Sequence, residues 1–432
     1  MFLVGPLLWI ACQSNKTEDC SISWEQPMPM TAVVTWNGEG QSPNEVKWTD
    51  NDGSVVTVPF NSEGVAEIYG LLPGYTHSYE LTGNGACQSE FQAEPLPFYF
   101  PNFSIETHHP ELMSEENYVL GVFVTFGYGY TAYVIDREGR PYWMYHEEAR
   151  MSAMTELDEH NEGVLLNSYP NNLAIDDGNI LRLNAMGERL ETIQTPLGHH
   201  AFEQLPDGTL AWPAFDIREW TDPETGDTVL VSGDMIVERE LDGTLTEVFN
   251  SWDWLEVIKH ERWEDAFLFQ GAHDWTHANT LGYYPDRDSY LVSLPYVQSI
   301  IEVDRASGAL LDDINPSTES FPDDPYVFQH FPVFLENDNM LLMSHAESGT
   351  AAIEYQFSDS GQMVPIWSHG EGEGITGNVL GQATRLSNGN TLVNYGGAGL
   401  MQEVTPDNVV VWELYTGMGI WMGSGQLLTA WP

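Results

Sequence analysis

The stretch that decides the fold is Ala132–Trp143, which reads Ala-Tyr-Val-Ile-Asp-Arg-Glu-Gly-Arg-Pro-Tyr-Trp. It contains an apolar strand, a turn at Gly139 and a second strand that ends in a tryptophan. Related phrases follow at Met235–Gly243, Ile300–Gly308 and Met401–Trp412. Repeats of roughly 40–60 residues built from short strands are typical of a β-propeller, whose blades bury their faces only by packing around an axis. Residues 98–432 have room for about six such blades.

The residues before this region predict a separate β-sandwich over residues 20–95. Five short alternating or β-branched runs are separated by Asn-Gly, Asp-Gly and Pro-Gly turns, at Ala32–Trp36, Glu45–Thr49, Ser54–Val58, Val65–Ile68 and Ser78–Thr82. The run Leu71–Tyr79 resembles the turn before a late strand of fibronectin type III domains. The predicted fold is therefore all-β: a six-bladed propeller preceded by a small fibronectin type III or immunoglobulin-like sandwich. Helices are expected to be scarce, with one short helix within Ser251–Arg262.

The charge balance excludes two classes of partner. Lys and Arg total 14 against 65 Asp and Glu, which gives a formal net charge of −51. Such a field repels nucleic acid and anionic membranes. A site for an anionic substrate has to be built locally, against this field.

Residues 1–19 read as an export signal and tether. Met1–Ala11 is apolar, too short to span a bilayer as a helix, and is followed by Cys12, which predicts a lipoprotein-type lipidation site. The alternative is an ordinary apolar N-terminus. Cys20 and Cys87 are a plausible disulfide in an oxidising compartment. We expect an exported protein, periplasmic or at the cell surface, that meets a membrane only through its lipid.

Three histidine-bearing segments precede strand-like runs, with His199 and His200 in the first, His277 in the second and His330 in the third. In a propeller the innermost strands line one channel, so distant histidines can meet there. Neutral imidazole is a base and nucleophile near neutral pH, and its cation holds anions. On a strand, His277 and Asn279 would share one face. The alternative is that each histidine only satisfies backbone groups between blades.

No metal site is predicted. His273 and His277 have the four-residue spacing of a helical zinc pair, but that spacing is too wide on a strand or loop. The remaining histidines, such as His345, are interpreted as structural or surface residues.

The segments resemble the PAPS-independent bacterial aryl-sulfate sulfotransferase (arylsulfotransferase) family. The strongest match is His273–Pro285, which fits the family's Asp-Trp-x-His-x-Asn strand. Further matches keep the family's order from about Leu120 to Leu414, at Gly198–His200, Leu205–Gly208, Gln329–His330, Ala352–Tyr355, Gly381–Leu392 and Glu403–Thr405.

The resemblance implies a six-bladed propeller behind a β-sandwich, an exported location and a ping-pong reaction without a cofactor. His330 would attack the sulfur of a phenolic sulfate, form a sulfohistidine and pass the sulfuryl group to a phenolic acceptor. His277 and Asn279 would hold the sulfuryl oxygens. His277 or the His199/His200 pair would move the phenolic proton.

One position departs from the family pattern. Tyr296 stands where the family places an arginine, and a tyrosine hydroxyl offers one neutral donor where a guanidinium pairs with two sulfate oxygens. Arg385 is a possible substitute, although its motif suggests a place between blades. The alternative functions are a surface-anchored propeller that has lost turnover and binds a ligand or protein, and a different hydrolase or lyase that uses the same histidines.

Overall fold

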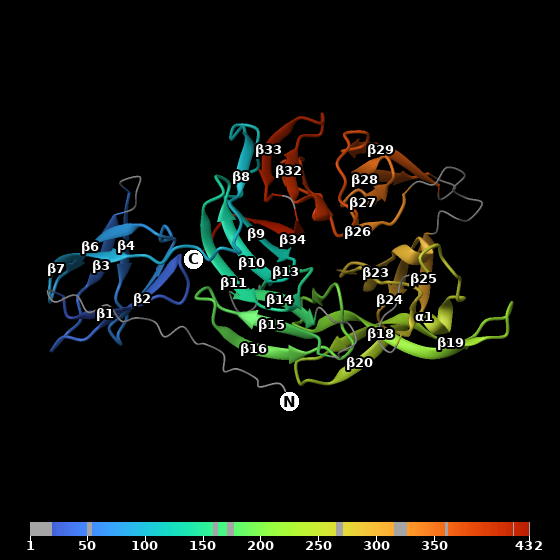
Figure 1. Ribbon diagram of the computed structural model, residues 1–432, viewed down its shortest axis with the longest axis horizontal. Coiled ribbons are helices and arrows are strands. Elements are labelled where there is room, and N and C mark those ends of the chain that lie inside the picture. Colours follow the sequence, from blue (N-terminus) through green and yellow to red (C-terminus); the bar gives the residue numbers. More distant parts are fainter. Residues whose placement is uncertain are drawn as a thin grey trace.

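Short antiparallel strands form nearly all the regular structure of the computed structural model (Figure 1). The structure describes residues 20–49, 54–158, 163–170, 177–264, 271–314, 326–358, 362–417 and 419–431. The prediction of an all-β fold is confirmed. Within these residues no helix has the length and apolar character needed to cross a bilayer. Cys12 lies outside the described residues, so its lipidation stays a prediction.

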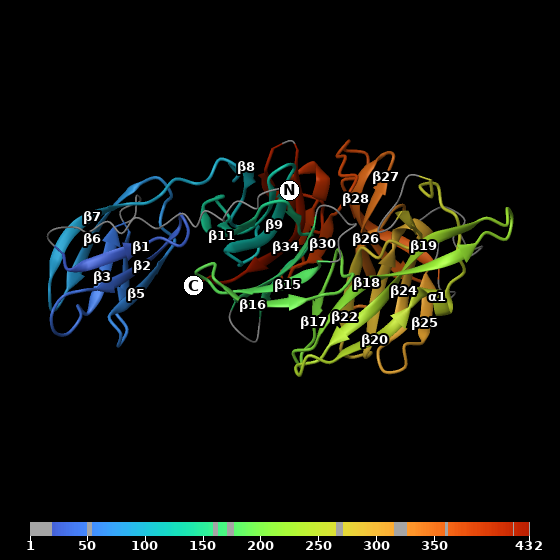
Figure 2. The same cartoon turned by 60° about the horizontal axis from the view of Figure 1, so that its bottom comes forward.

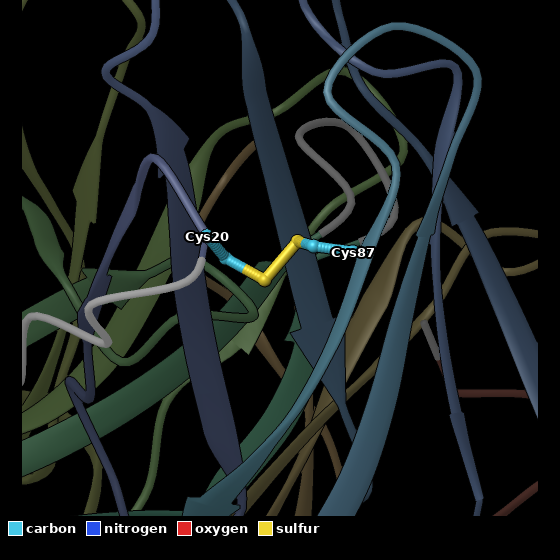
Figure 3. Close-up of a disulfide and its surroundings, with 2 residues drawn as sticks. All are labelled: Cys20 and Cys87. Carbon is cyan, nitrogen blue, oxygen red and sulfur yellow. A yellow bond between two sulfur atoms is a disulfide. The ribbon is translucent and has the colours of Figure 1, made fainter.

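The described residues of the N-terminal unit form seven strands in two sheets. The first sheet joins β1 (Ile22–Glu25), β2 (Thr31–Trp36) and β5 (Val65–Tyr69); the second joins β4 (Val55–Pro59), β3 (Glu45–Thr49), β6 (Thr76–Thr82) and β7 (Cys87–Gln92). Alternating residues such as Trp24, Trp48 and Tyr79 form the core between them. A disulfide joins Cys20 to Cys87 across the sandwich (Figure 3).

In the described part of residues 98–431, the strands form six consecutive sheets. The first holds β9 (Tyr118–Thr125), β10 (Gly129–Asp136), β11 (Pro141–Glu147) and β34 (Ile420–Leu428); the second holds β12 (Arg150–Met151), β13 (Thr155–Asp158), β14 (Gly163–Pro170), β15 (Asn179–Leu183) and β16 (Arg189–Gln194). The third holds β17 (Glu203–Gln204), β18 (Leu210–Thr221), β19 (Thr228–Arg239), β20 (Leu245–Asn250) and β21 (His273–Asp274). The fourth holds β22 (Thr280–Tyr284), β23 (Ser289–Leu294), β24 (Ser299–Asp304) and β25 (Leu310–Ile314). The fifth holds β26 (His330–Phe334), β27 (Met340–Ala346), β28 (Gly349–Phe357) and β29 (Met363–His369); the sixth holds β30 (Gln382–Arg385), β31 (Thr391–Asn394), β32 (Leu400–Val404), β33 (Val410–Tyr415) and β8 (Ser104–His108).

These sheets form a propeller-like ring. The inner strands of neighbouring sheets contact one another in the order β17, β22, β26, β30, β34 and β13. The C-terminal strand β34 pairs with β9, so the two ends of the ring share one sheet (Figure 1). Residues at the starts of the inner strands are therefore brought toward one axis.

Buried ion pairs recur between neighbouring sheets and hold the ring in register. Glu238 on β19 accepts from Arg305 at 2.7 Å, and Glu354 and Glu403 pair in the same way with Arg385 and Arg137 of the following sheet. The repeated acidic residue of the sequence phrase is thus an acceptor between sheets. Removing one partner of a buried pair leaves the other charge unpaired, which costs about 3–5 kcal/mol.

The sandwich packs against the first sheet of the ring (Figure 2). Met28 belongs to the core cluster that contains Trp143, and the Arg140 guanidinium donates to the Gly70 carbonyl at 2.6 Å. Both contacts lie on β11 or the turn before it.

The predicted helix over Ser251–Arg262 is wrong beyond its first turn. α1 spans only Ser251–Trp254, with Asn250 as its N-cap, and Leu255 is already extended. The following residues are held by tertiary contacts instead: Lys259 pairs with Asp222 at 2.5 Å, and His260 donates to the Asp274 carbonyl at 2.7 Å. These partners draw the chain away from a helical path.

A short helical turn also follows β23. The 3₁₀ turn η2 (Pro295–Val297) carries Tyr296, and a second, η3 (Gly396–Ala398), lies between β31 and β32.

Candidate active site

The histidines singled out in the sequence meet in one cluster. The ring centroids of His199 and His200 lie 5.1 Å apart, and those of His200 and His277 lie 4.8 Å apart. The charge of His330 lowers the pKa of His200, and the charge of His277 lowers the pKa of His330. His330 therefore lies near both residues. These residues precede β17, precede β22 and begin β26, so three sheets contribute to one place.

His199 and His200 form a hydrogen-bonded chain that ends on a carboxylate. His199 Nε2 lies 2.8 Å from Asp234 Oδ1, and the Nδ1 atoms of His199 and His200 are 2.8 Å apart. If Nε2–H of a neutral His199 donates to Asp234, its Nδ1 accepts from His200, and the lone pair of His200 is on Nε2. Burial, together with the charges of His277 and His199, lowers the pKa of His200 well below its usual value. His200 is therefore neutral at pH 7.

Asp234 also fixes the second histidine segment. Its Oδ2 accepts from the Thr276 hydroxyl at 2.6 Å and from the Ala278 backbone N–H at 2.7 Å. Burial opposes its charged form, but hydrogen bonds from His199 and Thr276 hold the pKa of Asp234 below its ordinary value. One carboxylate thus joins the His199 and His277 segments. Only the three-dimensional structure identifies Asp234, because no motif marks it.

His277 has its own carboxylate. Its Nδ1 lies 2.5 Å from Asp274 Oδ2, and its ring stacks on Tyr296 at 4.4 Å. Burial lowers the pKa of His277, but the nearby charge of Asp274 outweighs it, and the net shift is upward. His277 is therefore the member of the cluster most easily protonated.

His330, in contrast to His277, is kept in its unprotonated form. Its Nδ1 lies 3.3 Å from the Phe328 carbonyl, to which Nδ1–H donates, and this leaves the lone pair on Nε2. Burial, followed by the charge of His345, lowers the pKa of His330 well below its usual value. Within the described part of the chain, Nε2 has no hydrogen-bond partner. His330 is thus a neutral imidazole with an available nitrogen.

His345 was not predicted to be part of the cluster. Its ring lies 4.9 Å from that of His330, and its Nε2 and Nδ1 contact the Leu380 carbonyl and the Thr350 hydroxyl at 2.7 and 3.1 Å. Both nitrogens are therefore engaged by the protein, and burial lowers the pKa of His345 to about 4. The signal was in the pairing of β26 with β27: His330 pairs with Met343, and His345 lies two residues further on the same face.

The predicted strand face shared by His277 and Asn279 is wrong. β22 begins only at Thr280, and His277 is left-handed with φ of 56°, which breaks the alternation. Asn279 is buried, and its amide donates to the Gln329 carbonyl at 2.9 Å. Asn279 therefore ties the His277 segment to the residue before His330. A contact with a sulfuryl group stays a prediction.

Unusual backbone conformations concentrate at the cluster. His200, His277, Phe328 and Phe331 all have φ between 48° and 56°. Such conformations cost of order 1–3 kcal/mol each for a side chain other than glycine, and they persist where surrounding contacts impose them. The Phe331 N–H, for example, donates to the Thr280 hydroxyl at 3.0 Å. The backbone is held so that the imidazoles converge.

An apolar hollow opens beside His200. It has a volume of about 400 Å³, and its lining comes from the first and second sheets and His200, including Phe126, Met151 and Tyr169. The Tyr169 ring lies 6.2 Å from that of His200. We call this space the His200 hollow; it offers an apolar surface next to a polar cluster, as small-molecule sites commonly do.

Two arginines are candidates to replace the arginine that the family places at the position of Tyr296. Arg385 donates to Glu354 and to the Gly389 carbonyl, so it lies between sheets and does not replace the expected arginine. Arg262 instead lies at the cluster, with its guanidinium carbon 4.2 Å from the Phe328 ring centroid and 6.0 Å from that of Tyr296. No sequence motif indicated Arg262, because it lies between the short motifs that resemble the family.

The arylsulfotransferase (ASST) family model matches residues 105–311. This match supports an arylsulfotransferase-family member. The matched residues include His199, His200, His277 and Tyr296, whereas His330 lies beyond them. The match also supports a sulfotransferase-like function, and the family implies small phenolic substrates.

Solved structures resemble this chain only loosely. A protein of unknown function from Bacteroides caccae is 15% identical, with a TM-score of 0.43 over 72% of this chain and 98% of its own. A streptogramin B lyase is 12% identical, with a TM-score of 0.41 over 76% and 98% of the two chains. A periplasmic gluconolactonase from Pseudomonas aeruginosa is 10% identical, with a TM-score of 0.37 over 88% and 99%. These scores carry no conclusion about function. No curated protein matches the chain.

Proposed function

We propose that this arylsulfotransferase-family protein transfers a sulfuryl group from a phenolic sulfate to a phenol through a sulfohistidine on His330. The observation that carries the proposal is the contrast between two imidazoles in one cluster. His330 is kept neutral with its lone pair on Nε2, while Asp274 favours the protonated form of His277. Groups whose environments separate their pKa values are suited to nucleophile and acid roles at the same pH.

In the first half-reaction, His330 Nε2 attacks the sulfur of the donor and forms an N–S bond. The S–O bond to the aryl group breaks, its electron pair goes to the phenolic oxygen, and protonated His277 gives that oxygen its proton. In the second half-reaction, the oxygen of an acceptor phenol attacks the sulfur, the N–S bond breaks, and neutral His277 takes the phenolic proton. The charges and atoms of both halves balance without a cofactor.

The apolar hollow beside His200 supports a phenolic substrate. The His200 hollow is mostly apolar and contains Phe126 and Tyr169, which suit the flat ring of a phenol. His200 is also neutral, and its Nε2 is a second atom able to accept a phenolic proton. Asn279 fixes the Gln329 carbonyl next to His330.

Trapping of the covalent intermediate tests this proposal. Purified protein incubated with 4-nitrophenyl sulfate and no acceptor is expected to gain the mass of one sulfuryl group, mapped to His330 by peptide fragmentation. Addition of phenol removes that mass. His330→Ala does not gain the mass, whereas His109→Ala, at a histidine whose side chain is 54% exposed, gains it like the unmodified protein.

Absence of both label and nitrophenol release, with several acceptors over a broad pH range, would reject the transferase. That result would favour the second hypothesis, a propeller that binds a ligand or protein partner without turnover.

Export to an oxidising compartment is also part of the proposal. The disulfide between Cys20 and Cys87 supports it, because such bonds persist outside reducing cytosol. Mass spectrometry of the native N-terminus tests the lipid on Cys12; an unmodified cysteine there would reject the anchor.

A further inference from the structure

We propose that Arg262 binds the sulfate group of the donor and supplies the positive charge that Tyr296 does not. This inference rests on the transferase proposed above and names the residue that recognises the anionic part of its substrate. The Arg262 guanidinium carbon lies 4.2 Å from the ring centroid of Phe328, and the Phe328 ring lies 5.8 Å from the His330 ring. Arg262 is therefore at the His330 end of the cluster. It is a cation in a chain whose formal net charge is −51.

Among the described residues, Arg262 forms no ion pair, and it is exposed. Arg137, Arg305 and Arg385 are bound to glutamates between sheets, and Arg287 pairs with Glu302 and Asp338 on the surface. The Arg262 guanidinium therefore adds a positive charge near the neutral imidazole of His330, as an anionic substrate requires.

The backbone of Arg262 is attached to the catalytic cluster. Its N–H donates to His260 Nδ1 at 3.2 Å, and His260 Nε2–H donates to the carbonyl of Asp274 at 2.7 Å. Asp274 is the carboxylate that holds His277. The backbone of Arg262 is therefore linked through two hydrogen bonds to Asp274, the residue that holds His277.

The next residue anchors the segment in the protein. Trp263 is buried and stacks on His273 with ring centroids 4.6 Å apart, and the His273 ring contacts the Trp263 carbonyl at 2.8 Å. The His260 ring also lies 4.4 Å from Tyr296. These contacts hold the Arg262 segment beside Tyr296 and Phe328, and the guanidinium carbon lies over both rings. A guanidinium can bind two sulfate oxygens at once.

Two measurements on the full chain test this assignment: the KM for 4-nitrophenyl sulfate and the affinity for inorganic sulfate measured by calorimetry. Arg262→Gln is expected to raise the KM and weaken sulfate binding, each by roughly 10- to 100-fold, as for loss of a hydrogen bond to a charged group. Arg262→Lys is expected to have an intermediate KM and sulfate affinity, because an ammonium keeps the charge but lacks the paired donors of a guanidinium. Arg262→Gln combined with Tyr296→Arg is expected to recover sulfate binding.

Arg287→Gln is the matched control, because Arg287 also stacks on a phenylalanine, 4.4 Å from the Phe334 centroid, away from the cluster. Turnover with unchanged KM and sulfate affinity in Arg262→Gln would overturn the role of Arg262 and leave the transferase standing. Sulfate binding that depends on Arg262 without any turnover would support the anion site and reject the transferase. Absence of sulfate binding in the unmodified chain would overturn the anion site.

Discussion

Two regions of the same ring have opposite chemistry. The histidine cluster lies at or before the starts of β17, β22 and β26, with Arg262 beside it. A second hollow, of about 540 Å³, is lined by residues further along the inner strands and by Glu116, Glu156 and Glu203. We call it the acidic hollow.

The difference between them shows that the ring supplies convergence and the side chains supply function. In the acidic hollow, burial and the charge of Glu156 raise the pKa of Glu203 well above its usual value. That environment rejects negative charge, since even a resident carboxylate is driven toward its neutral form. The histidine cluster, in contrast, holds neutral imidazoles beside an arginine and an apolar wall, so it is the region to which the proposed sulfate ester is assigned.

The sharpest way to break this comparison is one substitution in each region. His330→Gln removes the nucleophile and is expected to lower kcat for sulfuryl transfer by roughly 10⁴-fold or more. Glu203→Gln, which mimics a protonated glutamate in the acidic hollow, should leave the rate nearly unchanged. Steady-state release of nitrophenol measures both. An equal loss in the two variants would end the distinction between the hollows.

A smaller effect is expected from the carboxylate behind His277. Asp274→Asn removes the charge that raises the pKa of His277, so the rate should fall by roughly 100-fold, the scale of one acid–base group. Activity that needs protonated His277 declines as the pH rises through its pKa. In the variant that decline should begin at a lower pH.

The pH profile of kcat/KM checks the effect of Asp274→Asn. Asp338→Asn, at an aspartate whose side chain is 84% exposed, is the control. A profile of Asp274→Asn that falls at the same pH as that of the unmodified protein would remove His277 as the acid.

The His200 hollow predicts a still smaller change. Phe126→Ala removes an aromatic wall and should raise the KM for 4-nitrophenyl sulfate by up to roughly tenfold, the scale of one aromatic contact. Tyr75→Ala, an exposed aromatic residue of the sandwich, should leave the KM unchanged. If the KM does not respond to Phe126→Ala, the aryl group binds elsewhere.

The smallest effect concerns stability in the acidic hollow. Because the folded pKa of Glu203 is raised, its neutral form stabilises the fold fully at pH below the unfolded value, and this stability is lost as the pH rises toward the folded value. Glu203→Gln cannot ionise, so its melting temperature relative to the unmodified protein should increase from acidic to neutral pH. A difference that is constant across this range would show that Glu203 is not the titrating group.

The sequence predicted the convergence of imidazoles better than it predicted their surroundings. Repeated strands and the order of motifs were sufficient to associate His199, His200, His277 and His330, because strand periodicity and blade closure are encoded locally. Asp234 and Arg262 were beyond reach, since each acts through partners distant in sequence and carries no spacing signal.

Local rules also failed where tertiary contacts override them. The left-handed His277 removed a predicted strand face, and contacts of Lys259 and His260 shortened a predicted helix. His345 was recoverable in principle, because it follows from the pairing of β26 with β27 once that register is known.

The pairing of β34 with β9 has a consequence for biosynthesis. Residues 420–428 are synthesised long after β9, yet they complete its sheet. The edge of β9 therefore stays unpaired in the nascent polypeptide until β34 has been made, and loop closure over such a separation is slow. Truncation of the polypeptide before β34 would leave that edge exposed to other chains.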